Sequence, residues 1–68
     1  MKITYDKKAD AMYIRFTNAK VAKTKEVDDN TLLDFDAKGS VIGVEVLFVK
    51  ERMPDVFKGI RVDRLQVL

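Results

Sequence analysis

The stretch Val41–Val49 reads VIGVEVLFV, and the rest of the chain is best interpreted outward from it. Its side chains are mostly β-branched or large and apolar, which favours an extended strand over a helix. Apolar residues occupy both alternating sets of positions, a pattern typical of a strand covered on both faces. Only Gly43 and the single charge Glu45 interrupt the run. We therefore expect this stretch to be the central strand.

The composition limits both the size of the core and the chemistry. The chain has 68 residues, with 13 Lys and Arg against 11 Asp and Glu, and neither Cys nor His. A single domain of this size hides only about 60% of the surface that its unfolded chain exposes. Disulfides, thiolate metal sites and histidine chemistry are excluded. Self-association is then the simplest source of further buried area, so we expect a homodimer.

No targeting or membrane segment is evident in the sequence. A strand-like KITY segment follows Met1, in place of a basic region with an apolar core. No apolar run approaches the roughly 20 residues that span a bilayer. We expect a single domain over residues 1–68 of a soluble, cytoplasmic protein without a membrane partner.

Alternating apolar and polar residues predict further strands on both sides of the central one. Val21–Val27 carries charge on both faces, which is typical of a sheet edge. Short polar turns join the strands, and Gly39 suits a turn that needs a positive φ angle. The fold class expected is mainly β, an antiparallel five- to six-stranded meander. Besides the central one, its strands are expected at Ile3–Tyr5, Ala11–Phe16, Val21–Val27, Thr31–Phe35 and Ile60–Leu68.

Helix punctuation appears near the C-terminus. Pro54 suits a first helical position and Gly59 suits a helix end, so a short helical turn is expected between them. The competing interpretation is an α+β fold with a longer amphipathic helix from Pro54 onward. Gly59 argues against that helix.

One face of the expected sheet is strongly apolar and cannot stay in water. Val56, Phe57 and the last strand are candidates to cover part of it, and a second copy of the chain is the candidate for the remainder. The face is expected to gather Met12, Ile14, Phe16, Leu33, Phe35, Ile42, Val44, Val46 and Phe48.

The segments ITYDKKADAMYIRF and KEVDDNTLLDFDAKGSVIGVEVL resemble the YuzE-like family, known mainly as domain of unknown function 2283. The resemblance covers about residues 2 to 48 and implies a mainly β fold. It implies no established activity. Some relatives occur beside small toxin-like proteins, which suggests an antitoxin-like role with a small protein partner. The matching positions are Tyr5, Asp6, Ala9, Asp10, Tyr13, Ile14, Glu26, Val27, Asp28, Asp34, Gly39, Gly43, Val44 and Glu45.

The acidic residues are the first candidates for chemistry. Converging turns could hold Mg²⁺ or Ca²⁺ through carboxylate oxygens, but turn capping is the favoured role because short polar side chains bond their own backbone. Motifs for a nucleophile, a phosphate loop or a dinucleotide are missing. We expect no enzyme activity and neither a cofactor nor a metal. The acids concerned are Asp6, Asp10, Asp28, Asp29, Asp34 and Asp36.

A weak nucleic-acid-binding protein is the alternative function. Tyr13 and Arg15 share a strand face, and Lys23 with Lys25 lie on a strand that could be its neighbour. Eleven acids dilute such a patch, and a solvated edge strand explains the same lysines. Nucleic acid is therefore not the expected partner.

Glu45 is the most informative single residue. If its strand is covered on both faces, its carboxylate needs a cation from Arg15, Arg61 or Arg64, within the chain or across a dimer. If its face is partly solvated, Glu45 reaches water instead, and this interpretation is favoured. The function expected is a small non-catalytic protein-interaction module that self-associates. Its candidate structural or interface residues are Tyr5, Asp6, Asp10, Tyr13, Arg15 and Glu45.

Overall fold

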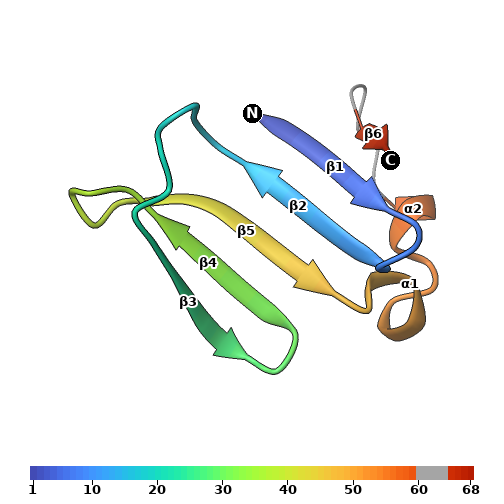
Figure 1. Cartoon of the computed structure of the whole chain (residues 1–68). Coiled ribbons are helices and arrows are strands. Elements are labelled where there is room, and N and C mark those ends of the chain that lie inside the picture. Colours follow the sequence, from blue (N-terminus) through green and yellow to red (C-terminus); the bar gives the residue numbers. More distant parts are fainter. Residues whose placement is uncertain (60–64) are drawn as a thin grey trace.

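A computed structural model describes residues 1–59 and 65–68 of the chain. In this part of the chain six strands form one sheet, and two short helical turns follow the fifth strand (Figure 1). The elements are β1 (Lys2–Asp6), β2 (Ala11–Arg15), β3 (Lys23–Asp28), β4 (Thr31–Phe35), β5 (Val41–Leu47), α1 (Val49–Arg52), α2 (Val56–Gly59) and β6 (Leu65–Val67).

The mainly β class and the helical turn after Pro54 are confirmed, but the strand order is not that of a simple meander. The order across the sheet is β3-β4-β5-β2-β1-β6. After β2 the chain crosses to the far edge, so that the apolar β5 gains a neighbour on each side while the charged β3 lies at the edge. All six residues of β3 are exposed, which confirms the predicted edge strand.

The last strand runs parallel to β1, whereas an antiparallel strand was expected. Because β5 pairs antiparallel with β2, and β2 with β1, β5 and β6 also run in the same direction. Parallel strands cannot be joined by a tight hairpin and need a crossover connection. The two helical turns α1 and α2 lie within the crossover connection between β5 and β6.

Strand register sorts the side chains onto two faces. On the apolar face, Ile14, Val44 and Leu33 lie in one row across three strands. On the opposite, polar face, Tyr13 lies directly beside Glu45. The predicted alternation is thereby confirmed for β2, β4 and the middle of β5.

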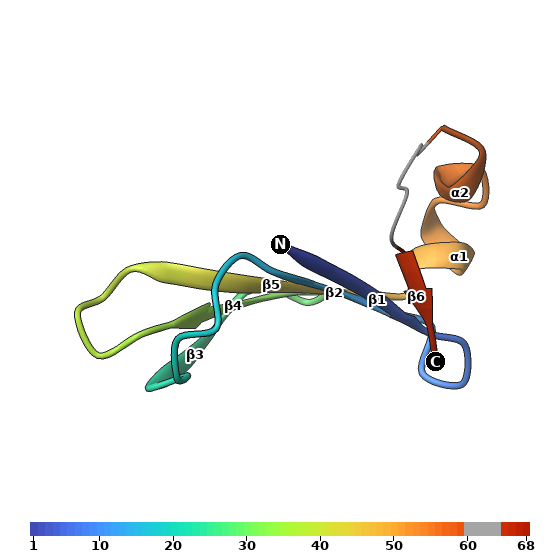
Figure 2. The same ribbon diagram turned by 90° about the horizontal axis from the view of Figure 1, so that it is seen from above.

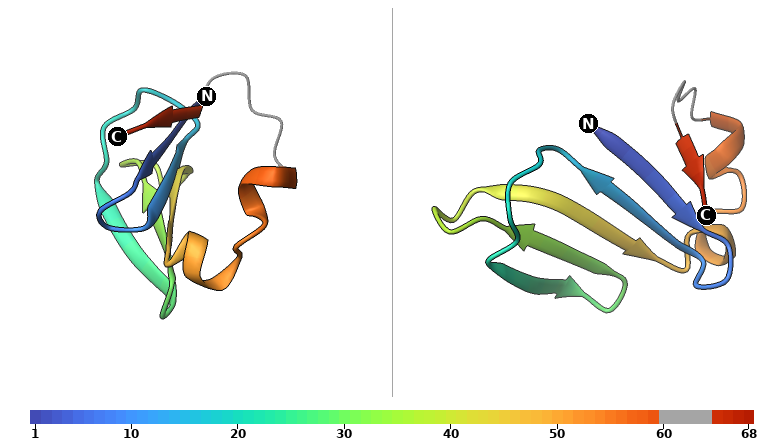
Figure 3. Two further views of the ribbon diagram at one scale, coloured as in Figure 1. Left: turned by 90° about the vertical axis from the view of Figure 1, so that its right-hand side faces the viewer. Right: turned by 45° about the horizontal axis from the view of Figure 1, so that its top comes forward.

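Both helical turns lie on the same side of the sheet, at the end where β1 and β6 are found (Figures 2 and 3). They cover the apolar face there, and the core forms around Tyr5, Met12 and Val49. Ile42 and Gly43 of β5 are buried, but residues 44–47 are only half-buried, so the expectation of a strand covered on both faces is confirmed only in part. Partly buried apolar side chains packed against this core are Ile3, Ile14, Val46, Val56, Phe57 and Leu65.

The central strand ends earlier than predicted. Phe48 has a φ of 54°, which turns the chain out of the sheet and into α1. Its side chain is 46% exposed, while Val49 is 1% exposed. The predicted place of Phe48 on the apolar face is therefore wrong, and Val49 packs into the core instead.

The C-terminal predictions have mixed outcomes. The helical turn ends at Gly59 and Leu65–Val67 is a strand, so a long helix through these residues is excluded. The predicted strand over Ile60–Leu68 is confirmed at its end, and its first part lies outside the described residues. Neither helical turn is long and apolar enough to cross a membrane.

Truncation of Phe48 and Val49 tests where the central strand β5 ends. Val49→Ala should lower the free energy of unfolding by roughly 1.5–3 kcal/mol, because buried methyl groups are lost and a cavity is left. Phe48→Ala should cost less than about 1 kcal/mol, although its side chain is larger, because much of that side chain is in water. Urea denaturation followed by circular dichroism measures both. A larger loss for Phe48→Ala would contradict the described end of β5.

Candidate functional site

Tyr5 and Asp10 join the first hairpin to the helical crossover. The Tyr5 hydroxyl donates to Asp10 Oδ1 over 2.7 Å. The backbone N–H groups of Lys50 and Glu51 donate to the two carboxylate oxygens over 2.8 and 3.1 Å. The N–H of Val49 donates to the Asp10 carbonyl oxygen over 3.1 Å. Asp10 thus satisfies three free donors at the start of α1.

Local chemistry explains why an aspartate occupies this position. Asp10 has a φ of 52°, a conformation that Asp adopts more readily than bulky or β-branched residues do. The residue before α1, Phe48, makes no side-chain capping hydrogen bond. The cap is therefore supplied from a distant turn, at a sequence separation of 40 residues.

The hydrogen bonds to Asp10 shift the pKa values of both Asp10 and Tyr5. The backbone N–H of Lys50 and the Tyr5 hydroxyl hold the pKa of Asp10 below its usual range. The hydrogen bond to Asp10, followed by burial, raises the pKa of the Tyr5 hydroxyl. Both shifts favour the charged carboxylate and the neutral phenol, so the pair has the features of a structural cap.

A second tyrosine organises the polar face. The Tyr13 hydroxyl donates to Asp34 on β4, and Thr24 on β3 donates to the same carboxylate over 2.5 Å. The hydrogen bond with Asp34 is the main cause that raises the pKa of Tyr13. To reach Asp34 from β2, the Tyr13 ring lies across Gly43 of β5. A Cβ at Gly43 would lie 2.5 Å from the Tyr13 hydroxyl oxygen and 3.0 Å from Cζ.

Arg15 and Glu45 do not form the predicted ion pair. The Arg15 guanidinium donates to the backbone carbonyls of Thr17 and Ala19 over 2.8 and 2.5 Å. Glu45 is half-buried on the polar face, consistent with the partly solvated alternative. Arg61 and Arg64 lie outside the described residues, so a pair between Glu45 and either of them stays a prediction.

Turn capping is confirmed for three of the candidate acids. Asp6 Oδ1 accepts from the N–H groups of Lys8 and Ala9. Asp28 and Asp36 cap their own turns in the same way. Among the residues that the structure describes, no three acidic side chains come together in a way that could hold a metal ion. These carboxylates serve local backbone geometry.

The basic patch behind the nucleic-acid alternative is not assembled. Lys25 pairs with Leu33, which places it on the apolar face, whereas Arg15 pairs with Gly43 on the polar face. Two strands, β4 and β5, also separate β3 from β2. The expectation that Lys23 and Lys25 lie beside Tyr13 and Arg15 is therefore wrong.

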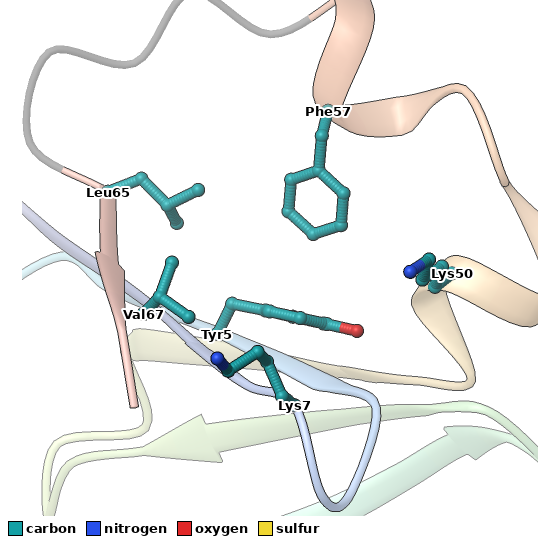
Figure 4. A pocket seen from close by; sticks show the side chains of 6 residues that line it. All are labelled: Tyr5, Lys7, Lys50, Phe57, Leu65 and Val67. Atoms are coloured by element: carbon teal, nitrogen blue, oxygen red, sulfur yellow. The ribbon is translucent and has the colours of Figure 1, made fainter.

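The structure reveals a pocket that the sequence patterns did not indicate. It has a volume of about 300 Å³ and lies on the apolar face, between the β1–β6 edge and the helical turns (Figure 4). Tyr5 forms its floor, and Phe57 meets the Tyr5 ring edge-on at a centroid distance of 4.8 Å. The sequence analysis named Phe57 as a candidate to cover the apolar face, but no sequence pattern indicated that two lysines would line a pocket beside it. The other lining residues are Lys7, Lys50, Leu65 and Val67.

Acid titration tests the Asp10 cap. Because the folded-state pKa of Asp10 is lowered, its stabilisation is fully present above the ordinary value of about 4 and is lost as the pH falls through the folded value. Asp10→Asn should lower the melting temperature on the order of 5 °C at pH 7. The difference from the unmodified chain should shrink towards pH 2. Thermal melts followed by circular dichroism measure it.

The control is Asp29→Asn, which removes an exposed acid from the β3–β4 turn. It should give a small difference without this pH dependence. A difference for Asp10→Asn that stays constant between pH 7 and pH 2 would show that the carboxylate charge does not contribute to the cap.

A double-mutant cycle tests the Tyr13–Gly43 contact. Gly43→Ala should cost about 1–3 kcal/mol of unfolding free energy, because the new methyl group displaces the Tyr13 ring. In a Tyr13→Ala background the same change should fall within about 0.5 kcal/mol of zero, since the clashing ring is gone. Urea denaturation of the four proteins gives the coupling energy. Additive effects would refute the contact.

Sequence comparisons relate the chain to known proteins. The uncharacterized protein MJ0789 of Methanocaldococcus jannaschii is 43% identical over 47 residues, which are 69% of this chain and 40% of that protein. The chain therefore spans less than half the length of this relative. No solved structure matches this chain significantly. Residues 2–50 match the family described as protein of unknown function (DUF2283), and the chain belongs to that family.

Proposed function

We propose that this protein is a small non-catalytic protein-interaction module that self-associates through the uncovered half of its apolar sheet face. We call this half the open face. The carrying observation is that the helical turns cover the apolar face only near β1 and β6 (Figure 3). The open face consists of Phe16, Leu33, Phe35, Val41 and Val44; Val41 belongs to it because a register shift pairs it with Phe35. Ile42, which pairs with Phe16, is only 2% exposed and adds no accessible area.

The open face retains exposed apolar area. Phe16 is 43% exposed and Val41 is 42% exposed, while Leu33, Phe35 and Val44 are only half-buried. Contiguous apolar area of this kind marks interaction surfaces on small proteins. A standard interface buries about 800 Å² per partner, roughly a seventh of the 5207 Å² accessible surface.

The thin core favours a second copy as the occupant. Only five apolar residues are buried among those described. Two copies related by a twofold axis would present the same apolar rows to each other, as most homodimers do. Lys23 and Lys25 would stay at the rim, where they reach water.

The polar groups of the described chain support a non-catalytic role. Asp10 caps α1, Asp34 accepts from Tyr13 and Thr24, and Asp6 closes a turn. These acids are held by structural hydrogen bonds rather than presented to a substrate. An antitoxin-like role, suggested by the family resemblance, would use the open face for a different small protein.

Sedimentation velocity between about 5 and 500 μM tests the proposal. The unmodified chain should shift from monomer to dimer across this range. Val41→Lys should weaken the dimer at least tenfold, because it places a charge in the apolar interface. Ala9→Lys adds the same charge to an exposed turn at the other end of the sheet and should leave the dimer intact. A purely monomeric chain at 500 μM would refute self-association.

A further inference from the structure

We propose that the pocket between β1, β6 and the helical turns receives one bulky apolar side chain of an acidic partner segment. The pocket lies on the covered half of the sheet, away from the open face. The inference therefore goes beyond self-association and names the chemistry of a different partner. Its basis is an apolar cavity whose rim carries positive charge.

The interior of the pocket suits an apolar side chain. Tyr5 is 6% exposed and presents its ring as the floor. Phe57 stands edge-on above that ring, at an angle of 67° between the two planes. Leu65 and Val67 form the wall on the β6 side (Figure 4). An aromatic or leucine side chain placed there would contact apolar surface on several sides.

The size and openness of the pocket favour a protein segment over a free small molecule. Sites for small molecules span about 300–1,000 Å³ and enclose most of the ligand. This pocket lies at the lower limit, at about 300 Å³, and Val67 on its wall is 52% exposed. A shallow apolar pocket that seats one anchor residue is the usual form of an interaction hot spot.

The rim determines the charge of the partner. Lys7 follows β1 and Lys50 belongs to α1, so the two ammonium groups come from separate elements. None of the described residues that line the pocket is an acid. Asp10 lies near Lys50, but its carboxylate accepts from Tyr5 and from two backbone N–H groups. Asp6 also acts on the Tyr5 hydroxyl, but its carboxylate accepts from the N–H groups of Lys8 and Ala9. The described lining thus carries two ammonium groups and no carboxylate. Acidic residues beside the apolar anchor would complement it.

The probe is a blocked pentapeptide with a central phenylalanine between two glutamates and with serine at each end. Amide NMR of the ¹⁵N-labelled full chain follows its binding. We expect a dissociation constant of about 1 mM or tighter, with shifts concentrated at Tyr5, Lys7, Lys50 and Leu65. Replacing the phenylalanine by alanine should abolish binding. Replacing both glutamates by glutamine should weaken it about fivefold or more.

Charge variants of the chain provide matched tests. Lys7→Gln and Lys50→Gln should each weaken binding about two- to fivefold, and together about tenfold. Lys8→Gln removes a neighbouring exposed lysine that does not line the pocket, and it should leave binding unchanged. Neither pocket variant removes a described hydrogen bond, because Lys50 reaches Asp10 through its backbone N–H.

Other outcomes would overturn the proposal. Absence of shifts at 5 mM peptide, or equal affinity for the glutamine peptide, would remove the acidic partner. Octanoate is the competing probe, and if it bound these residues more tightly than the peptide, the pocket would be a site for small amphipathic carboxylates. The Val41→Lys variant should bind the peptide as the unmodified chain does, so a failure of the dimer and a failure of the pocket are distinguishable.

Discussion

The contact between Asp10 and the start of α1 is the constraint on which the rest of the arrangement depends. It ties the turn between β1 and β2 to the crossover that follows β5, at a sequence separation of 40 residues. Once α1 is fixed there, Val49 is buried against Tyr5 and Met12. Further along the chain, β6 pairs with β1 at the same end of the sheet. One capped turn thereby determines where the last third of the molecule lies.

A small number of side chains also organises the polar face. Tyr13 crosses β5 above Gly43 to reach Asp34, and Asp34 also accepts from Thr24 at the edge strand. These two hydrogen bonds link β2, β4 and β3 across the intervening strand β5. The apolar face lacks such links and depends on burial instead. Since burial by α1 and α2 is confined to one end, apolar side chains such as Phe16 and Val41 stay partly exposed at the other end.

The sequence predicted the features that depend on local pattern. Alternation located five strands to within a few residues, and charge on both faces identified β3 as an edge. Features that depend on distant contacts were missed. Phe48 continues the apolar alternation, so nothing local shows that a positive φ removes it from the sheet. The parallel β6 and the Asp10 cap likewise arise from the crossover, which pairs segments far apart in the chain.

The extent of the family match bears on how the pocket is built. The match ends at residue 50, so Tyr5, Lys7 and Lys50 lie inside it, whereas Phe57, Leu65 and Val67 lie beyond it. Tyr5, which forms the floor, is held by its hydrogen bond to Asp10, another residue within the matched segment. The apolar wall is contributed by the segment outside the match. Because the floor lies inside the match and the apolar wall beyond it, the matched segment by itself does not form the pocket.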